Sequence, residues 1–495
     1  MSAHAARTVA RNSAFNLVAQ IAIKALSFLF TVYVVRDLGP ESYGTYAAIG
    51  AFGFLFIFIA DLGLSPYGVR EVARLRDQSD APAKLADLHS DLLALRVLLS
   101  ILAGGLTVGF GALTGRPELV LIALALNAVG LTLHGAQSAS GTVLGGLERM
   151  GVGAGALVFS QLVFIAAGAF ALWNGWGYLG LITANLLAIT LSTIVVLRAA
   201  ASVGWGSVSP ARWLPLIRAS LPFGIVTFAL GLSYKFDTVL LELTRPAGET
   251  GLYNAAYNLV FTSAVLSNIL NVALYPALAR LSVTAPERLP GIYARALRYL
   301  WLLALPIAVG GAVLAGDLVP FLFDSDYTAG GVALRIVIWV VPLMYTSEFL
   351  GYVVLIGNQE RRVARAVVIS TALNVTLNLI IVPIFGFVGA AVTTVITEAV
   401  LVAQYVWLLR ARLGALPLGQ MLARPALAAL GMGLLVAWLP AEWPVLLRVA
   451  AGVGLYGGLG LALGLITPDD WRFLRQLRRA EPQASEPPAD PHINA

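Results

Sequence analysis

The stretch that decides the fold is NSAFNLVAQIAIKALSFLFTVYVVR, residues 12–36. It is long enough to cross a membrane as one helix, because about 20 residues at a rise of 1.5 Å each span the hydrocarbon core. Its polar residues recur every three or four positions, so they share one face of the helix. That face carries Asn12, Asn16, Gln20, Lys24, Ser27 and Thr31.

Lys24 lies near the middle of this span, where a lysine costs at least about 2.5–3.5 kcal/mol on insertion scales. Two interpretations remain open. Lys24 could form a structural ion pair with a carboxylate of another helix, or it could line a water-filled path and meet an anionic substrate. Small polar residues alone would indicate helix packing, so the lysine within the stripe is what favours the second interpretation.

The composition places the chain among membrane proteins. Its 495 residues are 59% hydrophobic and 12% charged, whereas a soluble domain has about 25% charged residues. The sequence therefore predicts an all-α polytopic membrane protein. It contains no cysteine and four scattered histidines, so we expect no disulfide, no metal cluster and no cofactor.

Apolar segments indicate about fourteen transmembrane helices, most of them joined by short connections. The predicted spans are 13–36, 43–66, 91–113, 117–142, 152–173, 178–200, 217–243, 249–278, 292–314, 332–357, 361–383, 386–410, 419–439 and 443–467.

The distribution of basic residues sets the orientation. With the N-terminus in the cytoplasm, most lysines and arginines fall in cytoplasmic segments, and only Arg36, Arg116 and Arg245 fall outside. This agrees with the positive-inside rule, so both termini are predicted to be cytoplasmic; the family resemblance described below implies that the membrane is the bacterial inner membrane. The net charge of +6 follows from this asymmetry, and it does not indicate nucleic-acid binding.

An internal repeat is visible at offsets of 207 to 212 residues. YGTYAAIGAF at 43–52 resembles GLYNAAYNLV at 251–260, GGLER at 145–149 resembles GNQER at 357–361, and GYLGLI at 177–182 resembles GFVGAA at 386–391. Six spans separate the copies, so both have the same orientation. The repeat predicts two parallel six-helix lobes around a central cavity, which is a transporter design.

The predicted organisation has five parts. They are an N-terminal lobe at 1–200, a cytoplasmic linker at 201–216, a C-terminal lobe at 217–410, two further helices within 411–467, and a partly disordered cytoplasmic tail at 468–495. Residues 67–90 predict either an amphipathic helix on the inner surface or a solvated loop.

Polar residues within the spans suggest a substrate cavity, although the same residues also suit helix packing. The candidates are Lys24, Asn16, Gln20, Thr31, Lys235, Tyr234, Asn254, Asn258, Asn374 and Asn378. Intramembrane carboxylates could couple transport to Na⁺ or H⁺, or could form structural ion pairs. The candidates for these two roles are Asp61, Asp237, Glu348 and Glu398.

The opening, RNSAFNLVAQIAIKALSFLFTVYVVRDLGPESYGTYA followed by DLGLSPYGVREVAR, resembles the polysaccharide-transporter, or oligosaccharide flippase, family. That family belongs to the multidrug/oligosaccharidyl-lipid/polysaccharide exporter superfamily. GNQERR at 357–362, the repeat and the fourteen spans extend the likeness over most of the chain.

The resemblance implies alternating access and export of undecaprenyl-diphosphate-linked oligosaccharides from the inner to the outer leaflet, for O-antigen lipopolysaccharide, capsule or exopolysaccharide assembly. Membrane lipids surround such a protein, and a polymerase or ligase could be its partner. The resemblance also implies that cavity cations meet the diphosphate or acidic sugars, here Lys24 and Lys235, with Arg70 near the inner mouth.

Two other functions stay open as alternatives. The first is a Na⁺- or H⁺-coupled multidrug or metabolite exporter of the same superfamily, which a cavity dominated by carboxylates would favour. The second is a membrane-embedded polymerase or ligase, which would need large outer loops with acid–base residues. The predicted outer loops are short, so the sequence favours a transporter over an enzyme.

Overall fold

The computed structural model describes residues 3–465 except 79, 286, 288, 357–358 and 414–417, and it describes no side chains for residues 3–22 and a few isolated positions. Within this part, every regular element is a helix. The elements are α1 Ala3–Asp61, α2 Leu64–Leu75, α3 Ala81–Leu113, α4 Glu118–Gly146, α5 Met150–Trp173, α6 Gly177–Ala200, η1 Ala201–Val203, α7 Pro210–Thr244, α8 Ala247–Thr284, α9 Leu289–Phe323, η3 Ser325–Tyr327, α10 Gly330–Val337, α11 Val340–Ile356, α12 Glu360–Leu413, α13 Leu418–Ala437 and α14 Val445–Ala462.

All fourteen predicted spans fall on helices, but several boundaries differ from the prediction. The first two spans form one element, α1, which is broken at Gly39 (φ 68°), and the eleventh and twelfth form α12, broken at Gly386 (φ 57°). A positive φ suits glycine, and Pro40 directly after Gly39 cannot continue a helical hydrogen-bond ladder. The predicted tenth span is divided between α10 and α11.

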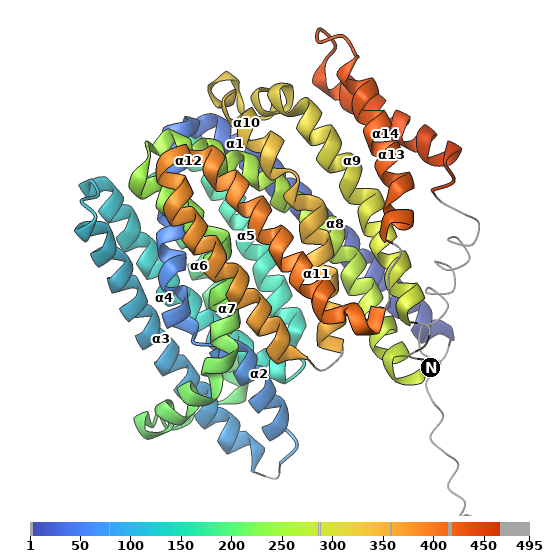
Figure 1. Cartoon of the computed structure of the whole chain (residues 1–495). Helices are drawn as coiled ribbons and strands as arrows, with labels where there is room; N and C mark the ends of the chain where they lie inside the picture. The colour runs from blue at the N-terminus through green and yellow to red at the C-terminus, as the bar shows by residue number, and fades with distance from the viewer. Residues whose placement is uncertain are drawn as a thin grey trace, which may run out of the picture.

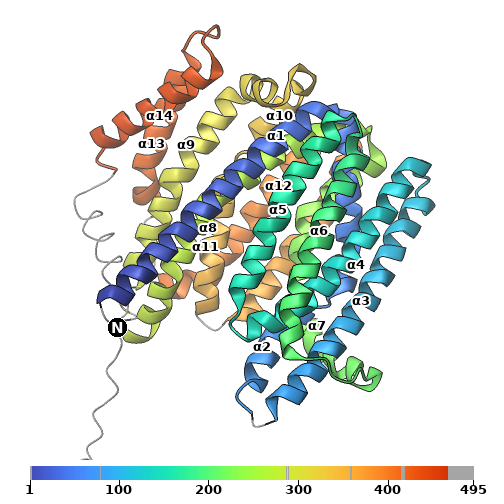
Figure 2. The same ribbon diagram turned by 180° about the vertical axis from the view of Figure 1, so that it is seen from behind.

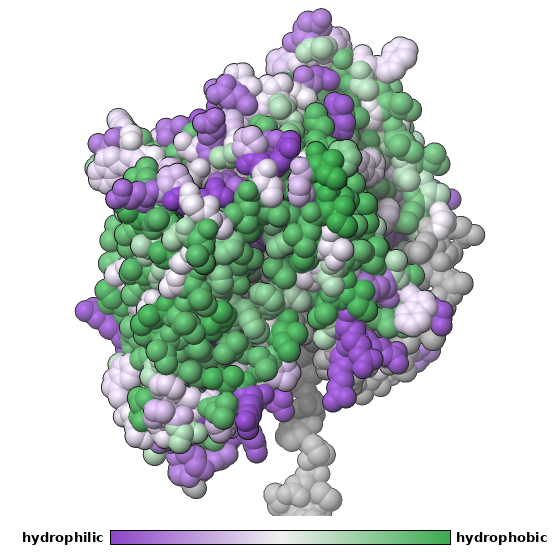
Figure 3. All heavy atoms as spheres, turned by 60° about the vertical axis from the view of Figure 1, so that its left-hand side comes forward, coloured by the Kyte–Doolittle hydropathy of each residue, from purple (hydrophilic) through white to green (hydrophobic). Residues whose placement is uncertain are grey.

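Long apolar helices dominate the described part of the chain. Nine of its helices are long and apolar enough to cross a membrane, or ten if the bent halves of α7 are counted as one span. Figure 3 shows a broad hydrophobic belt across the middle of one face, with hydrophilic residues gathered above and below it. Such a belt matches the hydrocarbon core of a bilayer, so the protein is a multi-pass membrane protein.

The helices form two lobes and a C-terminal pair. Helices α1–α6 make up one lobe and α7–α12 the other, and the two views show them side by side with α1 running along the boundary (Figures 1 and 2). Helices α13 and α14 pack on each other and on α9. Gly177 and Gly386, which the repeat pairs, have nearly equal φ values of 56° and 57°.

The inner surface helix is shorter than the predicted segment 67–90. Only α2 is a separate amphipathic helix, and it buries Leu64, Gly68 and Val72 along one face. The chain then turns near Asp80, and residues 81–90 form the first turns of α3. Pro82 suits the first turn of a helix because its missing N–H has no partner there, which explains why the boundary lies at this point.

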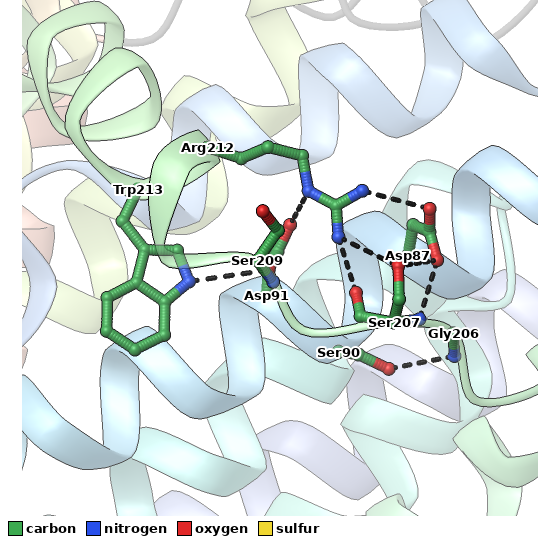
Figure 4. A network of polar contacts seen from close by, with 8 residues as sticks. All are labelled: Asp87, Ser90, Asp91, Gly206, Ser207, Ser209, Arg212 and Trp213. Atoms are coloured by element: carbon green, nitrogen blue, oxygen red, sulfur yellow. Dashed lines mark hydrogen bonds and ion pairs between the residues drawn. The ribbon is translucent and has the colours of Figure 1, made fainter.

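The predicted linker, residues 201–216, consists of η1, residues 204–209 without regular structure and the first turns of α7, and it is held against the N-terminal end of α3 (Figure 4). The Asp87 carboxylate accepts hydrogen bonds from the Ser207 backbone N–H at 2.7 Å and from the Arg212 guanidinium at 2.9 Å. Both hydrogen bonds lower the pKa of the Asp87 carboxyl below its ordinary value, and the bond from the Ser207 backbone has the larger effect. Arg212 also pairs with Asp91, so the linker is fixed to the N-terminal lobe at two carboxylates.

Candidate transport cavity

The two lobes meet closely near the ends that the sequence predicts to face outward, at the two glycines that the repeat pairs. A Cβ added to Gly44 of α1 would lie 2.0 Å from the Ala247 carbonyl oxygen, and one added to Gly251 of α8 would lie 2.0 Å from the Pro40 carbonyl oxygen. The two contacts are equivalent under the repeat, because Pro40 corresponds to Ala247. Only glycine permits backbones to approach this closely.

The outer-side arginines reinforce this contact. Arg116 pairs with Glu242 of α7 at 3.0 Å, and Arg36 of α1 donates to the backbone carbonyls of Phe321 and Leu322 on α9. Both arginines therefore join one lobe to the other. These contacts give a structural role to two arginines that the sequence places in outer segments.

A second pair of glycines joins the lobes near their inner ends. Gly63, at the turn between α1 and α2, lies so close to α7 that an added Cβ would be 2.4 Å from the Gly224 backbone nitrogen. One turn along α1, Phe58 packs on Phe228 with ring centroids 4.7 Å apart. The lobes therefore touch near both ends, along the boundary formed by α1, α7 and α8.

Between these two contacts lies a cavity of about 380 Å³ lined by α1, α4, α5, α6, α7 and α8. This volume is within the range of about 300–1,000 Å³ for small-molecule sites. Its walls include Phe30, Val34, Tyr43, Tyr46, Phe164 and Ile182. Aromatic rings of this kind can pack against the faces of sugar rings.

The polar lining of the cavity consists mainly of amides and one amine. Its members are Thr31, Asn127, Asn185, Lys235, Asn254 and Asn258. Asn258 donates to the Tyr43 hydroxyl at 2.5 Å, while Asn254 donates to the Thr250 carbonyl at 2.9 Å and accepts from the Thr238 hydroxyl at 3.2 Å. Amides both donate and accept hydrogen bonds, as sugar hydroxyls require.

Lys235 is the cation of this cavity within the described residues. Its side chain is half-buried, and no described carboxylate forms an ion pair with it. The nearby Asp237 instead accepts hydrogen bonds from the Tyr253 hydroxyl and, at 2.7 Å, from the Thr238 backbone N–H. Lys235 therefore interacts with Asp237 electrostatically but not in an ion pair, and an amine placed in this way in a membrane-embedded cavity can bind an anion.

The structure brings only some of the sequence-predicted cavity residues together. Thr31, Lys235, Asn254 and Asn258 line the central cavity. Tyr234 and Asn374 line a separate small pocket of about 20 Å³ within the C-terminal lobe. Asn378 is buried and donates to the Asn374 side-chain oxygen at 3.0 Å.

The remaining candidates lie elsewhere. The side chain of Lys24 is exposed and is not part of the cavity lining, and Arg70 is exposed on α2. The side chains of Asn16 and Gln20 lie outside the described residues. Lys24 is seven residues before Thr31, so it lies on the same face of α1 two turns nearer the N-terminus.

The four candidate carboxylates have two different kinds of partner. Asp61 forms an ion pair with Arg96 of α3, and both line a cavity of about 280 Å³ between α1, α3, α4 and α7. Glu398 accepts from the Ser347 hydroxyl, and Glu348 accepts from the Ser267 hydroxyl at 2.8 Å. Among the described residues, Asp237, Glu348 and Glu398 thus have hydroxyl groups as hydrogen-bond partners and form no ion pair.

Sequence reasoning missed several cavity residues. Asn127 and Asn185 are each isolated in an apolar span, with no polar residue three or four positions away on the same face to reveal a stripe. Arg96 and His134, which line a second cavity with Asp61, were also missed, although Ser100 and Ser138, each four positions further on, line the same cavity. The described part of the chain contains no group of three His, Cys, Asp or Glu residues that could hold a metal ion.

Comparison with known proteins decides the family. The model of the family described as "Polysaccharide biosynthesis protein" matches residues 9–282, more than half of the chain. The chain belongs to this family.

Two archaeal proteins from Haloferax volcanii are similar to this chain. The "Probable low-salt glycan biosynthesis flippase Agl15" is 23% identical over 410 residues, covering 79% of this chain and 81% of the relative. The "Probable flippase AglR" is 24% identical over 414 residues, with the same coverage.

Solved structures support the same fold. "Lipid II flippase MurJ, inward closed conformation" has a TM-score of 0.75 at 14% identity, covering 93% of this chain and 99% of that one. The inward-facing conformation of a multidrug resistance MATE family transporter has a TM-score of 0.65 at 14% identity, covering 81% and 98%. The fold is therefore common to flippases and drug transporters, and it does not separate these two functions.

Proposed function

We propose that this chain is an alternating-access flippase that moves an undecaprenyl-diphosphate-linked oligosaccharide from the inner to the outer leaflet of the bacterial cytoplasmic membrane. The observation that supports this most is Lys235, a cavity amine that forms no ion pair with a described carboxylate and lies beside four asparagines and aromatic walls. A diphosphate or acidic sugar would form an ion pair with this amine, and the amides would bind sugar hydroxyls. The flippase names of the relatives agree with this substrate class.

In this proposal Lys24 is an approach residue. It shares a helix face with the cavity residue Thr31 and lies two turns nearer the inner end of α1. A diphosphate arriving from the inner leaflet would meet Lys24 first and Lys235 second. Arg70, exposed on α2, would add positive charge at the inner mouth.

The product would then be used by a separate enzyme. A flippase moves its substrate without changing covalent bonds, so we propose that the chain is a transporter and that a polysaccharide polymerase or ligase acts on the exported glycan. Both termini would face the cytoplasm, as the distribution of arginines predicts.

Binding of the charged substrate tests this proposal directly. We expect Lys235→Ala to weaken binding of a polyprenyl-diphosphate oligosaccharide to the purified protein about tenfold or more, since a hydrogen bond to a charged group contributes about 1.5–3 kcal/mol. Lys84→Ala is the matched control, because Lys84 is exposed and pairs with Asp80. Equal affinity of the Lys235→Ala protein and the wild type would contradict the role of Lys235.

A cation-coupled exporter is the second candidate, and one observation favours it. Asp237, Glu348 and Glu398 are held in the C-terminal lobe by hydroxyl groups, without described cationic partners. Such carboxylates could bind Na⁺ or H⁺. The same cluster could also supply the coupling ion of a flippase, so substrate specificity separates the two functions and ion dependence does not.

A further inference from the structure

A second hollow lies on α12, away from the central cavity. It has a volume of about 560 Å³ and lies between the inner ends of the two halves of α12, where the helix begins and ends. No residue lines both this hollow and the central cavity. We call it the α12 pocket, and its main lining residues are Arg362, Arg365, Ile369, Gln404, Trp407 and Arg410.

Three arginines give the α12 pocket its charge. The side chains of Arg362, Arg365 and Arg410 are exposed, and none of them forms an ion pair with a described carboxylate. Arg362 donates to the Gln359 side-chain oxygen at 3.2 Å, which leaves other N–H groups of its guanidinium available. Three uncompensated guanidinium groups around one hollow provide a strong attraction for phosphate.

The rest of the lining is suited to a membrane surface. Trp407 and Ile369 are 58% and 57% exposed, so both offer apolar area beside the arginines. The Arg410 guanidinium lies over the Trp407 ring, 4.9 Å from its centroid. Tryptophan and arginine together are typical of the interface between lipid headgroups and hydrocarbon.

The pocket is also held in shape. Gln404 on the second half of α12 donates to the Ser370 hydroxyl on the first half at 2.8 Å. Ala366, which lines the pocket floor, is buried. The arginines therefore project from two helices that are fixed to each other, which reduces the entropy lost when a ligand binds.

We propose that the α12 pocket binds the phosphate headgroup of an anionic phospholipid of the inner leaflet. The arginines would bind the phosphate, and the exposed faces of Trp407 and Ile369 would contact the glycerol and upper acyl chain. Basic pockets between transmembrane helices on the cytoplasmic side bind anionic headgroups in this way. The apolar lining favours a lipid over a soluble phosphate, and the proposal does not depend on the transported substrate.

Native mass spectrometry of the full-length protein in detergent tests this site. The protein is titrated with phosphatidylglycerol and, separately, with phosphatidylcholine. We expect the variant carrying Arg362→Gln, Arg365→Gln and Arg410→Gln to bind phosphatidylglycerol about tenfold more weakly or worse, since each arginine near an anionic surface contributes substantially to attraction. Phosphatidylcholine binding should not change.

Two controls make the result specific. A variant with Arg74→Gln, Arg198→Gln and Arg361→Gln removes the same charge from exposed positions outside the pocket lining, and it should bind phosphatidylglycerol like the wild type. Arg365→Lys keeps the charge, so this variant should bind phosphatidylglycerol more tightly than Arg365→Gln. Such a partial recovery would show that the loss of affinity in Arg365→Gln is not due to misfolding.

Three outcomes would overturn the proposal. They are unchanged phosphatidylglycerol binding in the pocket variant, an equal loss in the control variant, and displacement of the bound lipid by millimolar inorganic phosphate or glycerol phosphate. The second would mean attraction to net charge alone. The third would mean a site for soluble phosphate.

Discussion

At the scale of residues, the central cavity is defined by an imbalance of charge. Lys235 lines it without a described counter-ion, while Asp237, two positions later, points to Tyr253 and Thr238 on the other side of α7. Residues two apart on a helix do not face each other, so Lys235 and Asp237 interact electrostatically without forming an ion pair. Anion binding and cation coupling can therefore use different faces of one helix.

Asp237→Asn tests whether the buried carboxylate couples transport to an ion. The amide keeps the size of the side chain but removes its charge, so we expect flipping in proteoliposomes to lose its response to a Na⁺ or H⁺ gradient and to remain at the gradient-free rate. The measurement compares rates with and without each gradient. If the Asp237→Asn protein still responds to the gradient like the wild type, Asp237 has only a structural role.

The sequence identified some of the cavity residues and missed others. The three-and-four spacing of polar residues identified Thr31, and polar residues within other predicted spans identified Lys235, Asn254 and Asn258, all of which line the cavity. Asn127 and Asn185 reach the same cavity from α4 and α6 as isolated polar residues. Asn127 and Asn185 line the cavity because of the way the helices pack together. The spacing of polar residues within one helix does not predict this packing.

At the scale of elements, paired glycines control how the lobes meet. Gly44 and Gly251 form the outer contact, and Gly63 and Gly224 form the inner one. A transporter that alternates its access must open one contact while keeping the other. The outer contact also carries the Arg116–Glu242 ion pair and the Arg36 hydrogen bonds, so it has polar reinforcement as well as close packing.

Gly251→Leu should weaken the outer contact, because a side chain there would overlap the Pro40 carbonyl. Overpacking of this kind costs about 1–3 kcal/mol, so we expect the lobes to spend more time apart at their outer ends. Spin labels at Asn174→Cys and Asp326→Cys can report this separation, since the natural chain contains no cysteine. The distance distribution should shift to longer values.

Gly105→Leu is the control for this experiment, because an added Cβ at Gly105 meets nothing within 4 Å. Gly44→Leu, on the other lobe, should reproduce the effect of Gly251→Leu. An outer distance distribution that stays unchanged in both contact variants would rule out a gating role for this glycine pair.

Helices were predicted well and their ends less well. Long apolar runs identify all fourteen spans, but α3 begins ten residues before the predicted span and α10 and α11 divide another. Hydropathy measures which residues prefer lipid, and a helix that continues into water keeps its backbone hydrogen bonds beyond the lipid boundary. The helical path of α1 is broken at Gly39, which has a positive φ and precedes Pro40, and that of α12 is broken at Gly386, which also has a positive φ.

At the scale of the whole molecule, the distribution of arginines predicts orientation. Of the three outer-side arginines, Arg36 and Arg116 bind the opposite lobe, and Arg245 pairs with Glu249 at 2.9 Å. Each of these arginines thus has a structural partner, so their predicted outer position is compatible with the positive-inside rule.

Single cysteines test this orientation in intact cells. A membrane-impermeant maleimide should label Asn174→Cys, in the connection between α5 and α6, and should label Gln78→Cys, between α2 and α3, only after the membrane is permeabilised. The chain has no other cysteine to interfere. Labelling in the reverse pattern would invert the topology, and with it the proposed direction of transport.

The central claim is that the cavity carries a lipid-linked oligosaccharide past Lys235. The most direct test is a flipping assay in proteoliposomes that contain a fluorescent polyprenyl-diphosphate oligosaccharide, with a cationic dye measured in parallel and with Lys235→Ala and Lys84→Ala compared. We predict protein-dependent movement of the lipid-linked sugar, at least about tenfold slower in Lys235→Ala and unchanged in Lys84→Ala. Gradient-driven movement of the dye, with the lipid-linked sugar left in its original leaflet, would contradict the flippase and support the exporter.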